Sequence, residues 1–378
     1  MAVKKYKLGE LIELVDETNS KGLYGPDDVR GINNQKEMMK SKADLNGRDL
    51  TKFQIVKQGE FVFNHRTSRN GSKFSITYNI DAEPHIFTED YVVFRIKDNC
   101  SHIILKEWLY MFFCRPEFDR YVITNSWGSS TEFFNWSDLC DVAILLPPIE
   151  QQFKFVNVYL SLQANLKAYQ NKTDDLKLVC DGYMDHLKKT AKTEKIGDYI
   201  ELYDVRNSEG KYTLKDLKGI SIDKKFIESK ADMNGVSLNP YILVKPTYFT
   251  FVPVTSRNGG KITLAYNDTQ ETYIVSSAYN VFRIINDSNL LPDYLFMFFN
   301  RPEFDRYARF NSWGSAREVF TIDDMNDVRI PIPNIEIQRD IVNIHRCYIE
   351  RKRIAEKLKQ TLNDLCPILI RGSLQTAN

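Results

Sequence analysis

The sequence lacks the patterns that most often indicate a metalloprotein, a secreted protein or a membrane protein. Its 378 residues include six cysteines without a CxxC pair and five histidines without metal-ligand spacing, so neither a disulfide framework nor a zinc site is expected. It has no run of about 18 apolar residues and no signal-peptide pattern. The net charge of +1 does not exclude a nucleic-acid partner, because binding depends on local basic surface. We expect a cytoplasmic protein without a membrane partner.

The motifs for nucleotide and methyl-group transfer are missing too. The sequence contains no P-loop and no Gly-rich strand-to-helix turn. The nearest approach to the Asn/Asp-Pro-Pro-Tyr/Phe loop that holds a flipped adenine is Asn239-Pro240-Tyr241, which lacks the second proline. We interpret these three residues as a turn and expect no catalytic residue, no metal and no cofactor in this chain.

What the sequence does contain is a long internal duplication. Residues 111–129 read MFFCRPEFDRYVITNSWGS, and residues 297–315 read MFFNRPEFDRYARFNSWGS. Two shorter motifs recur in the same order, SKADLNG at 41–47 and SKADMNG at 229–235, and TSRNGSK at 67–73 and TSRNGGK at 255–261. A repeat of this length indicates two versions of one structural unit.

Both versions carry the same pattern of expected elements. Runs rich in Val, Ile, Tyr and Phe predict strands at 53–63, 91–96 and 142–148, and again at 241–251, 279–284 and 328–333. The TSRNG motifs lie between such runs, which predicts a polar loop at the end of a hairpin. In RPEFDRY the phenylalanine is expected in the core. Arg115 with Asp119, like Arg301 with Asp305, has the spacing of an ion pair along a helix.

A long helical stretch follows each globular part. Its apolar residues recur at spacings of three and four, as in a coiled-coil seam. The seam positions are Tyr159, Leu162, Leu166, Tyr169, Thr173, Leu176, Cys180, Tyr183 and Leu187 in the first stretch, and Ile344, Tyr348, Arg351, Ala355, Leu358, Leu362, Leu365 and Leu369 in the second. About 38 helical residues would span roughly 57 Å. We therefore expect the two helices to pack against each other, with Pro367 interrupting the second.

The expected fold class is α+β. Two similar mixed α/β domains are separated by two long helices that form an antiparallel coiled coil, with pseudo-twofold symmetry. The expected boundaries are 1–148 for the first domain, 149–194 for the central spacer helix, 195–334 for the second domain and 335–378 for the C-terminal spacer helix.

With these motifs, nearly the whole chain resembles the specificity subunits of Type I restriction–modification enzymes. The TSRNG loops, the RPEFDRY…NSWGS segments, PPIEQQ at 147–152 and PNIEIQ at 333–338 carry the resemblance. It implies non-catalytic recognition of double-stranded DNA, in which each target-recognition domain reads half of a bipartite sequence and the helices set the gap. It also implies two methyltransferase subunits that methylate adenine with S-adenosylmethionine, and restriction subunits that use ATP and Mg.

Base reading requires side chains with paired donors and acceptors, and both polar loops supply them. The candidate DNA-binding residues are Thr67, Ser68, Arg69, Asn70, Lys73, Asn125, Ser126, Trp127 and Ser129, with Thr255, Ser256, Arg257, Asn258, Lys261, Asn311, Ser312, Trp313, Ser315 and Arg317 in the second version. The alternative is a pair of turns whose polar groups satisfy local backbone. Arg120 and Arg306 are further candidates for phosphate contact.

Two hypotheses about the whole chain remain open at this stage. The first is a DNA-specificity subunit whose similar domains read related half-sites in inverted orientation. The second is a protein-interaction scaffold in which the long helices hold partners and the globular domains bind peptides or proteins. The recurrence of the polar loops at the same place in both versions favours the first.

Overall fold

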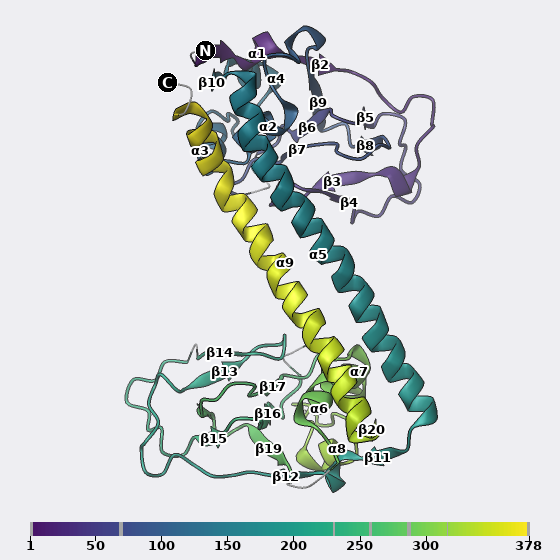
Figure 1. The fold of residues 1–378 in the computed structure, drawn as a ribbon, viewed down its shortest axis with the longest axis vertical. Helices are drawn as coiled ribbons and strands as arrows, with labels where there is room; N and C mark the ends of the chain where they lie inside the picture. Colours follow the sequence, from purple (N-terminus) through teal and green to yellow (C-terminus); the bar gives the residue numbers. More distant parts are fainter. Residues whose placement is uncertain are drawn as a thin grey trace. The chain divides into compact units, whose positions relative to one another are not determined.

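The computed structural model folds into two compact units, drawn as a ribbon in Figure 1. Unit 1 contains the residues up to 170 together with those from 353 onward, and unit 2 contains residues 171–352. Each unit thus combines a globular domain with one end of each long helix. None of the helices in the described ranges has the length and hydropathy of a membrane span. The ranges described are 3–67, 71–229, 231–256, 259–285, 289–315 and 317–375.

The globular part of unit 1 is built on an antiparallel sheet of four strands in the order β2-β9-β6-β7. Three two-stranded sheets, β1-β10, β3-β4 and β5-β8, surround it. The elements are β1 (Lys4–Lys7), α1 (Leu8–Leu11), β2 (Ile12–Val15), η1 (Pro26–Asp28), β3 (Arg30–Ile32), β4 (Met38–Lys40), β5 (Gln54–Val56), β6 (Phe61–Asn64), β7 (Ile76–Tyr78), β8 (His85–Phe87), β9 (Tyr91–Ile96), η2 (Asp98–Cys100), α2 (Lys106–Phe113), α3 (Pro116–Thr124), α4 (Trp136–Asp141) and β10 (Ala143–Leu146).

Unit 2 repeats this topology with the sheet order β12-β19-β16-β17 and the pairs β11-β20, β13-β14 and β15-β18. Its elements are β11 (Thr193–Lys195), η3 (Ile196–Asp198), β12 (Ile200–Leu202), β13 (Lys218–Ile220), β14 (Phe226–Glu228), β15 (Ile242–Val244), β16 (Phe249–Phe251), β17 (Leu264–Tyr266), β18 (Tyr273–Val275), β19 (Asn280–Ile284), α6 (Pro292–Phe299), α7 (Pro302–Phe310), α8 (Ile322–Asn326) and β20 (Arg329–Pro331). The duplication in the sequence is therefore a duplication of fold.

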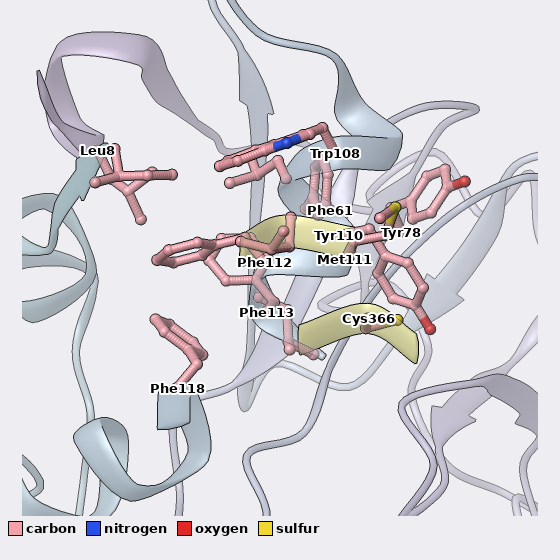
Figure 2. Packing of buried hydrophobic residues seen from close by; sticks show 14 of the residues in the cluster. Leu8, Phe61, Tyr78, Trp108, Tyr110, Met111, Phe112, Phe113, Phe118 and Cys366 are labelled. Carbon is pink, nitrogen blue, oxygen red and sulfur yellow. The ribbon is translucent and has the colours of Figure 1, made fainter. Parts of the chain in front are cut away.

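The core of unit 1 is an aromatic cluster between the sheet and helices α2 and α3 (Figure 2). Phe61 stacks on Phe94 with ring centroids 5.0 Å apart, and Phe113 meets Phe61 edge-on at 6.0 Å. Phe118 of RPEFDRY lies 4.9 Å from Phe113 and is 2% exposed, so its expected place in the core is confirmed. Such ring pairs add about 0.5–1.5 kcal/mol each beyond the area they bury.

The expected strands at 53–63 and 241–251 were wrong as single strands. In unit 1 a turn separates β5 from β6, and β5 pairs with β8 while β6 pairs with β7 and β9. Gly59 adopts φ +82° in this turn, a conformation that glycine tolerates. Unit 2 makes the same turn with Thr247 at φ 69°. In both units the left-handed residue lies in a short polar stretch, Lys57 to Glu60 or Lys245 to Thr247, that interrupts the apolar run.

The two long helices, α5 (Ile149–Thr190) and α9 (Ile335–Gln375), pack together as expected. In unit 1 the N-terminal part of α5 shares the core with the C-terminal part of α9, through Tyr159 and Leu362 among others. In unit 2 the C-terminal part of α5 and the N-terminal part of α9 share the core, through Leu187 and Ile341. Helices α5 and α9 thus run in opposite directions.

Two details of the helices differ from the expectation. Tyr183 is 43% exposed, whereas the neighbouring Met184 is 1% exposed and lies in the core, so the seam shifts by one residue after Cys180. Pro367 does not end the second helix, which continues to Gln375. A proline lacks the N–H that would bond to the carbonyl four residues earlier, and the Cys366 thiol donates to the Leu362 carbonyl oxygen at 3.3 Å beside this gap.

The glutamines of the PPIEQQ and PNIEIQ motifs fasten each helix to its domain. The side-chain oxygen of Gln152 accepts from the Leu105 N–H at 2.9 Å, and its amide donates to the carbonyls of Ile103 and Pro147 at 2.8 and 2.9 Å. Gln338 makes the equivalent bonds in unit 2. Both side chains are fully buried, so each motif satisfies three backbone groups where the helix begins.

The expected ion pairs inside RPEFDRY were wrong. Asp119 pairs with Lys36 at 2.5 Å, and Asp305 pairs with Lys224 at 2.7 Å. Arg115 instead lies with its guanidinium 4.0 Å from the centre of the Phe112 ring. The helical spacing placed the aspartates correctly on a helix, but their side chains face inward, toward lysines from another part of the chain.

Candidate nucleic-acid interface

The two polar loops of unit 1 meet at one place, although about 60 residues separate them in sequence. Residues 132–134 connect them through isolated bridges that Phe133 makes with Arg66 and Trp127. Thr67 donates its N–H to the Glu132 carbonyl at 3.0 Å, and Phe134 donates to the His65 carbonyl at 2.9 Å. Trp127 and Phe133 exchange both backbone hydrogen bonds, at 3.1 and 3.0 Å. We call residues 65–67, 127 and 132–134 the loop junction of unit 1.

Unit 2 contains the same loop junction, formed by residues 253–255, 313 and 318–320. Thr255 donates its N–H to the Glu318 carbonyl at 2.9 Å, and Phe320 donates to the Pro253 carbonyl at 2.9 Å. Trp313 and Val319 exchange both backbone hydrogen bonds at 3.1 and 3.0 Å. The chain therefore builds the same hydrogen-bonded arrangement twice, where the start of each TSRNG motif meets the tryptophan of NSWGS.

A glycine makes the tight turn after each tryptophan possible. Gly128 has φ +151° and Gly314 has φ +144°, values that side-chain-bearing residues rarely adopt. A Cβ atom on Gly128 would lie 1.9 Å from the Thr131 carbonyl oxygen, and one on Gly314 would lie 2.1 Å from the Arg317 carbonyl oxygen. The NSWGS motif thus requires glycine at this position for steric reasons.

The tryptophans of both loop junctions project into solvent. The exposed fraction is 73% for Trp127 and 69% for Trp313. An indole at this exposure contributes little to the core, and its backbone is held by the bridge to residue 133 or 319. Such an aromatic surface is suited to packing on a sugar or a base.

Four hydroxyl groups that the sequence predicts to read bases instead donate to backbone carbonyls of the protein. The Thr67 and Thr255 side chains each donate to the carbonyl of residue 132 or 318 at 3.2 Å. Ser126 and Ser312 are 8% and 7% exposed, and each donates to the carbonyl four residues earlier, at 2.7 and 2.6 Å. The structure uses these four donors to hold the loops.

The asparagines that precede these serines also bond to local backbone. The Asn125 amide donates to the Tyr121 carbonyl at 2.7 Å and the Asn311 amide to the Tyr307 carbonyl at 2.9 Å, so each closes the end of its helix. Both bonds are made by the side-chain nitrogen of the asparagine, and the side-chain oxygen takes no part in them. The motif NSWGS therefore combines a helix end, Asn-Ser, with an exposed tip, Trp-Gly-Ser.

The remaining candidates lie at the surface or outside the described residues. Lys73, Ser129, Ser256, Lys261, Ser315 and Arg317 are exposed. Lys261 has its amine 3.5 Å from the Asp223 carboxylate. Ser68, Arg69, Asn70, Arg257 and Asn258 lie outside the part of the chain that the structure describes. Arg120 and Arg306 are 70% and 69% exposed in their side chains, beside Glu117 and Glu303.

Charged side chains that the sequence reasoning missed flank the two junctions, and they differ between the units. In unit 1 Arg66 pairs with Asp90 at 2.8 Å. The equivalent positions in the repeat are Val254 and Ala278. Burial and the charge of the neighbouring Arg66 lower the pKa of His65. A comparison of the two repeats, position by position, would have identified this substitution.

Unit 2 has a charged pair on the other side of its junction. Arg309 forms an ion pair with Glu318, whereas unit 1 has Ile123 and Glu132 at these positions. Nearby, Phe310 is 77% exposed, and its equivalent is Thr124. The two junctions therefore share one backbone arrangement but present different side chains.

Among the residues that the structure describes, no group of three or more His, Cys, Asp or Glu side chains could hold a metal ion. A cavity of about 350 Å³ lies in unit 1 where the chain enters α5, between Tyr6, His102 and Pro148. Its lining also includes the charged residues Lys4 and Glu150.

Comparisons with known proteins bear on the family and the fold of the chain. Residues 189–364 match the family model of the Type I restriction modification DNA specificity domain. This range covers the whole second globular domain, from β11 to β20, and much of helix α9. The internal duplication supplies a second version in the first half of the chain. No curated protein sequence matches the chain at a significant level.

Solved structures resemble the chain over nearly its whole length. The S subunit of a Type I restriction-modification system from M. genitalium aligns with a TM-score of 0.62 and 13% identity, covering 98% of this chain and 96% of that one. At this identity the likeness concerns the fold. The HsdS subunit from Thermoanaerobacter tengcongensis aligns with a TM-score of 0.37 and 14% identity, covering 100% of this chain and 97% of that one. That score is too low to add to the argument.

Proposed function

We propose that each of the two globular domains of this chain reads one half of a bipartite target in double-stranded DNA, because residues 189–364 match the family model of the Type I restriction modification DNA specificity domain and the first globular domain repeats the fold of the second. The observation that carries the proposal is the loop junction, which the chain builds twice with the same hydrogen bonds. Each junction holds an exposed tryptophan beside the threonine that begins the TSRNG motif. A site that holds its contact residues in a fixed geometry is what sequence discrimination requires.

Within each loop the proposed roles follow from the side chains. The arginine and asparagine of TSRNG supply the donor and acceptor patterns that recognise guanine and adenine. The exposed lysines, Lys73 and Lys261, contact phosphate, because a lone ammonium group positions without reading sequence. Trp127 and Trp313 pack on sugar or base. The buried threonines and serines hold the loops in place.

The half-sites read by the two domains are proposed to be related but not identical, in inverted orientation. The shared backbone of the junctions supports the relation. Their flanking charges support a difference, since Arg66 and Asp90 in unit 1 are replaced by Val254 and Ala278. Arg317, which is exposed and stands where unit 1 has Thr131, is a further candidate for base discrimination.

The long helices are proposed to set the gap between the half-sites and to dock two methyltransferase subunits. Large apolar side chains on their outer surfaces support docking, among them Leu178 at 75% exposed and Ile368 at 63%. The partners would supply S-adenosylmethionine and methylate adenine at N6. Restriction subunits using ATP and Mg would complete the system. This chain contributes recognition and no catalysis.

The test is to express the chain with the methyltransferase subunits of its system and to map N6-methyladenine by single-molecule sequencing. We expect a bipartite motif with a fixed gap that appears only when the chain is present. A complex that assembles fully but leaves no chain-dependent methylation would refute the proposal.

A matched pair of variants makes the same test specific to the loops. Alanine at both Arg69 and Arg257 should abolish sequence-specific methylation while the complex still assembles. Leu23, 72% exposed in unit 1 and outside the loop junction, serves as the control, and Leu23→Ala should leave the motif unchanged. Normal methylation by the double arginine variant would show that another loop reads the DNA.

A further inference from the structure

The turn between β3 and β4 places a lysine in a conformation unusual for its residue type. Lys36 has φ +62°, in the left-handed region that side chains disfavour. The Lys36 N–H donates to the Asn33 carbonyl at 2.9 Å, and the Glu37 N–H donates to the Asn33 side-chain oxygen at 3.0 Å. Unit 2 repeats the conformation at Lys224, with φ +58°. A conformation that is disfavoured yet built twice indicates a constraint elsewhere.

That constraint is visible at the end of the lysine side chain. The Lys36 amine is buried and donates to the Asp119 carboxylate at 2.5 Å and to the Phe113 carbonyl at 2.7 Å. In unit 2 the Lys224 amine donates to Asp305 at 2.7 Å and to the Phe299 carbonyl at 2.6 Å. The side chains of these four charged residues are between 4% and 12% exposed.

The carboxylate oxygen that accepts from the lysine also accepts a backbone N–H. Asp119 Oδ1 accepts the N–H of Phe74 at 3.1 Å, and Asp305 Oδ1 accepts the N–H of Ile262 at 3.2 Å. Phe74 and Ile262 come directly after the TSRNG loops. The other end of each loop is fixed at Thr67 or Thr255 in the loop junction. The loops are therefore held at both ends.

We propose that Lys36 with Asp119, and Lys224 with Asp305, are positioning couples that fix the C-terminal ends of the two DNA-reading loops. The inference rests on the proposed function, since it assigns these residues a role in reading the half-sites. In each couple the lysine holds the aspartate, and the aspartate holds the loop. None of the four residues touches DNA in this proposal.

Two observations favour positioning over simple stabilisation. A buried ion pair is a poor source of stability, because well-packed apolar residues of similar volume often serve equally well or better. In addition, the turns around the lysines have diverged, reading NNQKE at 33–37 and SIDKK at 221–225, while the lysine itself is the same in both. A charged acceptor forms a stronger hydrogen bond to the loop N–H than a neutral one. The charge of the aspartate therefore strengthens its hydrogen bond to the loop.

Two double variants of unit 1 separate the roles. Lys36→Met with Asp119→Leu removes the charges and the acceptor for the Phe74 N–H. Lys36→Met with Asp119→Asn removes the charges but retains a side-chain oxygen at the acceptor position. Both are made in the full chain, assembled with the methyltransferase subunits, and compared by N6-methyladenine mapping and by thermal unfolding.

We expect the Leu variant to lose roughly tenfold in base discrimination at one half-site only, and the Asn variant to retain most of it. The matched variant of unit 2, Lys224→Met with Asp305→Leu, should relax the other half-site. Because the two couples lie in different units, each unit serves as the control for the other.

Three results would count against the couples or the function, and they are distinguishable. Relaxation of both half-sites together, in proportion to the fall in Tm, would show that the couples only stabilise the fold. Full discrimination by the Leu variant would also overturn the positioning role. If the unmodified chain itself directs no bipartite methylation, the proposed function fails and not merely the role of the couples.

Discussion

Replacement of Gly128 by alanine tests whether the loop junction is as tightly constrained as the structure indicates. At φ +151° an L-residue pays a conformational penalty of about 1–3 kcal/mol. The new Cβ would lie 1.9 Å from the Thr131 carbonyl oxygen and 2.9 Å from the carbonyl carbon. Since real contacts of this kind are much longer, the turn has to open, and overpacking of this kind adds about 1–3 kcal/mol.

The expected total, about 2–6 kcal/mol, is large for one loop but small enough that the rest of unit 1 keeps its fold over most of that range. Opening the turn should release the bridge between Trp127 and Phe133, so the tryptophan and the adjoining loop lose their fixed positions. We therefore expect a lower Tm together with a loss of methylation that exceeds what the unfolded fraction explains.

A glycine with positive φ and open surroundings provides the control. Gly47 has φ +72° and no atom within 4 Å of an added Cβ, so Gly47→Ala should cost only about 1 kcal/mol from backbone conformation. The assay is thermal unfolding of both variants in parallel, with methylation mapping of each complex. If Gly128→Ala and Gly47→Ala behave alike in both measurements, the steric argument for the NSWGS turn is wrong.

Three further outcomes follow from the structure. Trp127→Ala should lower DNA affinity roughly tenfold with an unchanged Tm, measured by fluorescence anisotropy of the assembled complex; an equal loss of Tm would place the indole in the fold. Arg66→Val with Asp90→Ala should shift the first half-site toward the second in methylation maps, at a stability cost below about 1 kcal/mol. Burial lowers the pKa of His345, so its contribution to stability is present above its unfolded pKa of about 6.5 and is lost as pH falls through its lower folded pKa; His345→Phe should flatten this pH dependence of Tm, and an unchanged dependence would contradict the reasoning.

The sequence predicted the features that depend on periodicity and repetition. The duplication, the seam of helices α5 and α9, and the burial of Phe118 follow from local patterns, because a helix buries residues at fixed intervals. The turn that splits 53–63 was missed because the apolar residues on both sides were read as one strand, although Lys57-Gln58-Gly59-Glu60 interrupts them and Gly59 is left-handed there.

The sequence could not supply the contacts between distant segments. Asp119 was assigned to Arg115 by helical spacing, yet its partner Lys36 lies 83 residues away. Likewise, nothing in the sequence around Thr67 indicates that its hydroxyl donates a hydrogen bond to the Glu132 carbonyl. Such pairs depend on how distant segments of the chain are brought together in the fold. No short stretch of the sequence indicates this. The positions of the candidate loops were therefore predictable, but the division of their residues between framework and exposed tip was not.

The composition of unit 1 has a consequence for the order of folding during synthesis. Its core includes Leu362, Cys366 and Ile370, and the fully buried Trp108 donates its indole N–H to the Ser373 hydroxyl at 3.1 Å. A ribosome delivers these late residues only after every residue of unit 2 has emerged. The globular domain at 1–148 must therefore wait, with part of its apolar surface uncovered, for helix α9. The usual order in which the earlier of two domains matures first is reversed here, and release of the chain before residue 362 would leave unit 1, not unit 2, without a finished core.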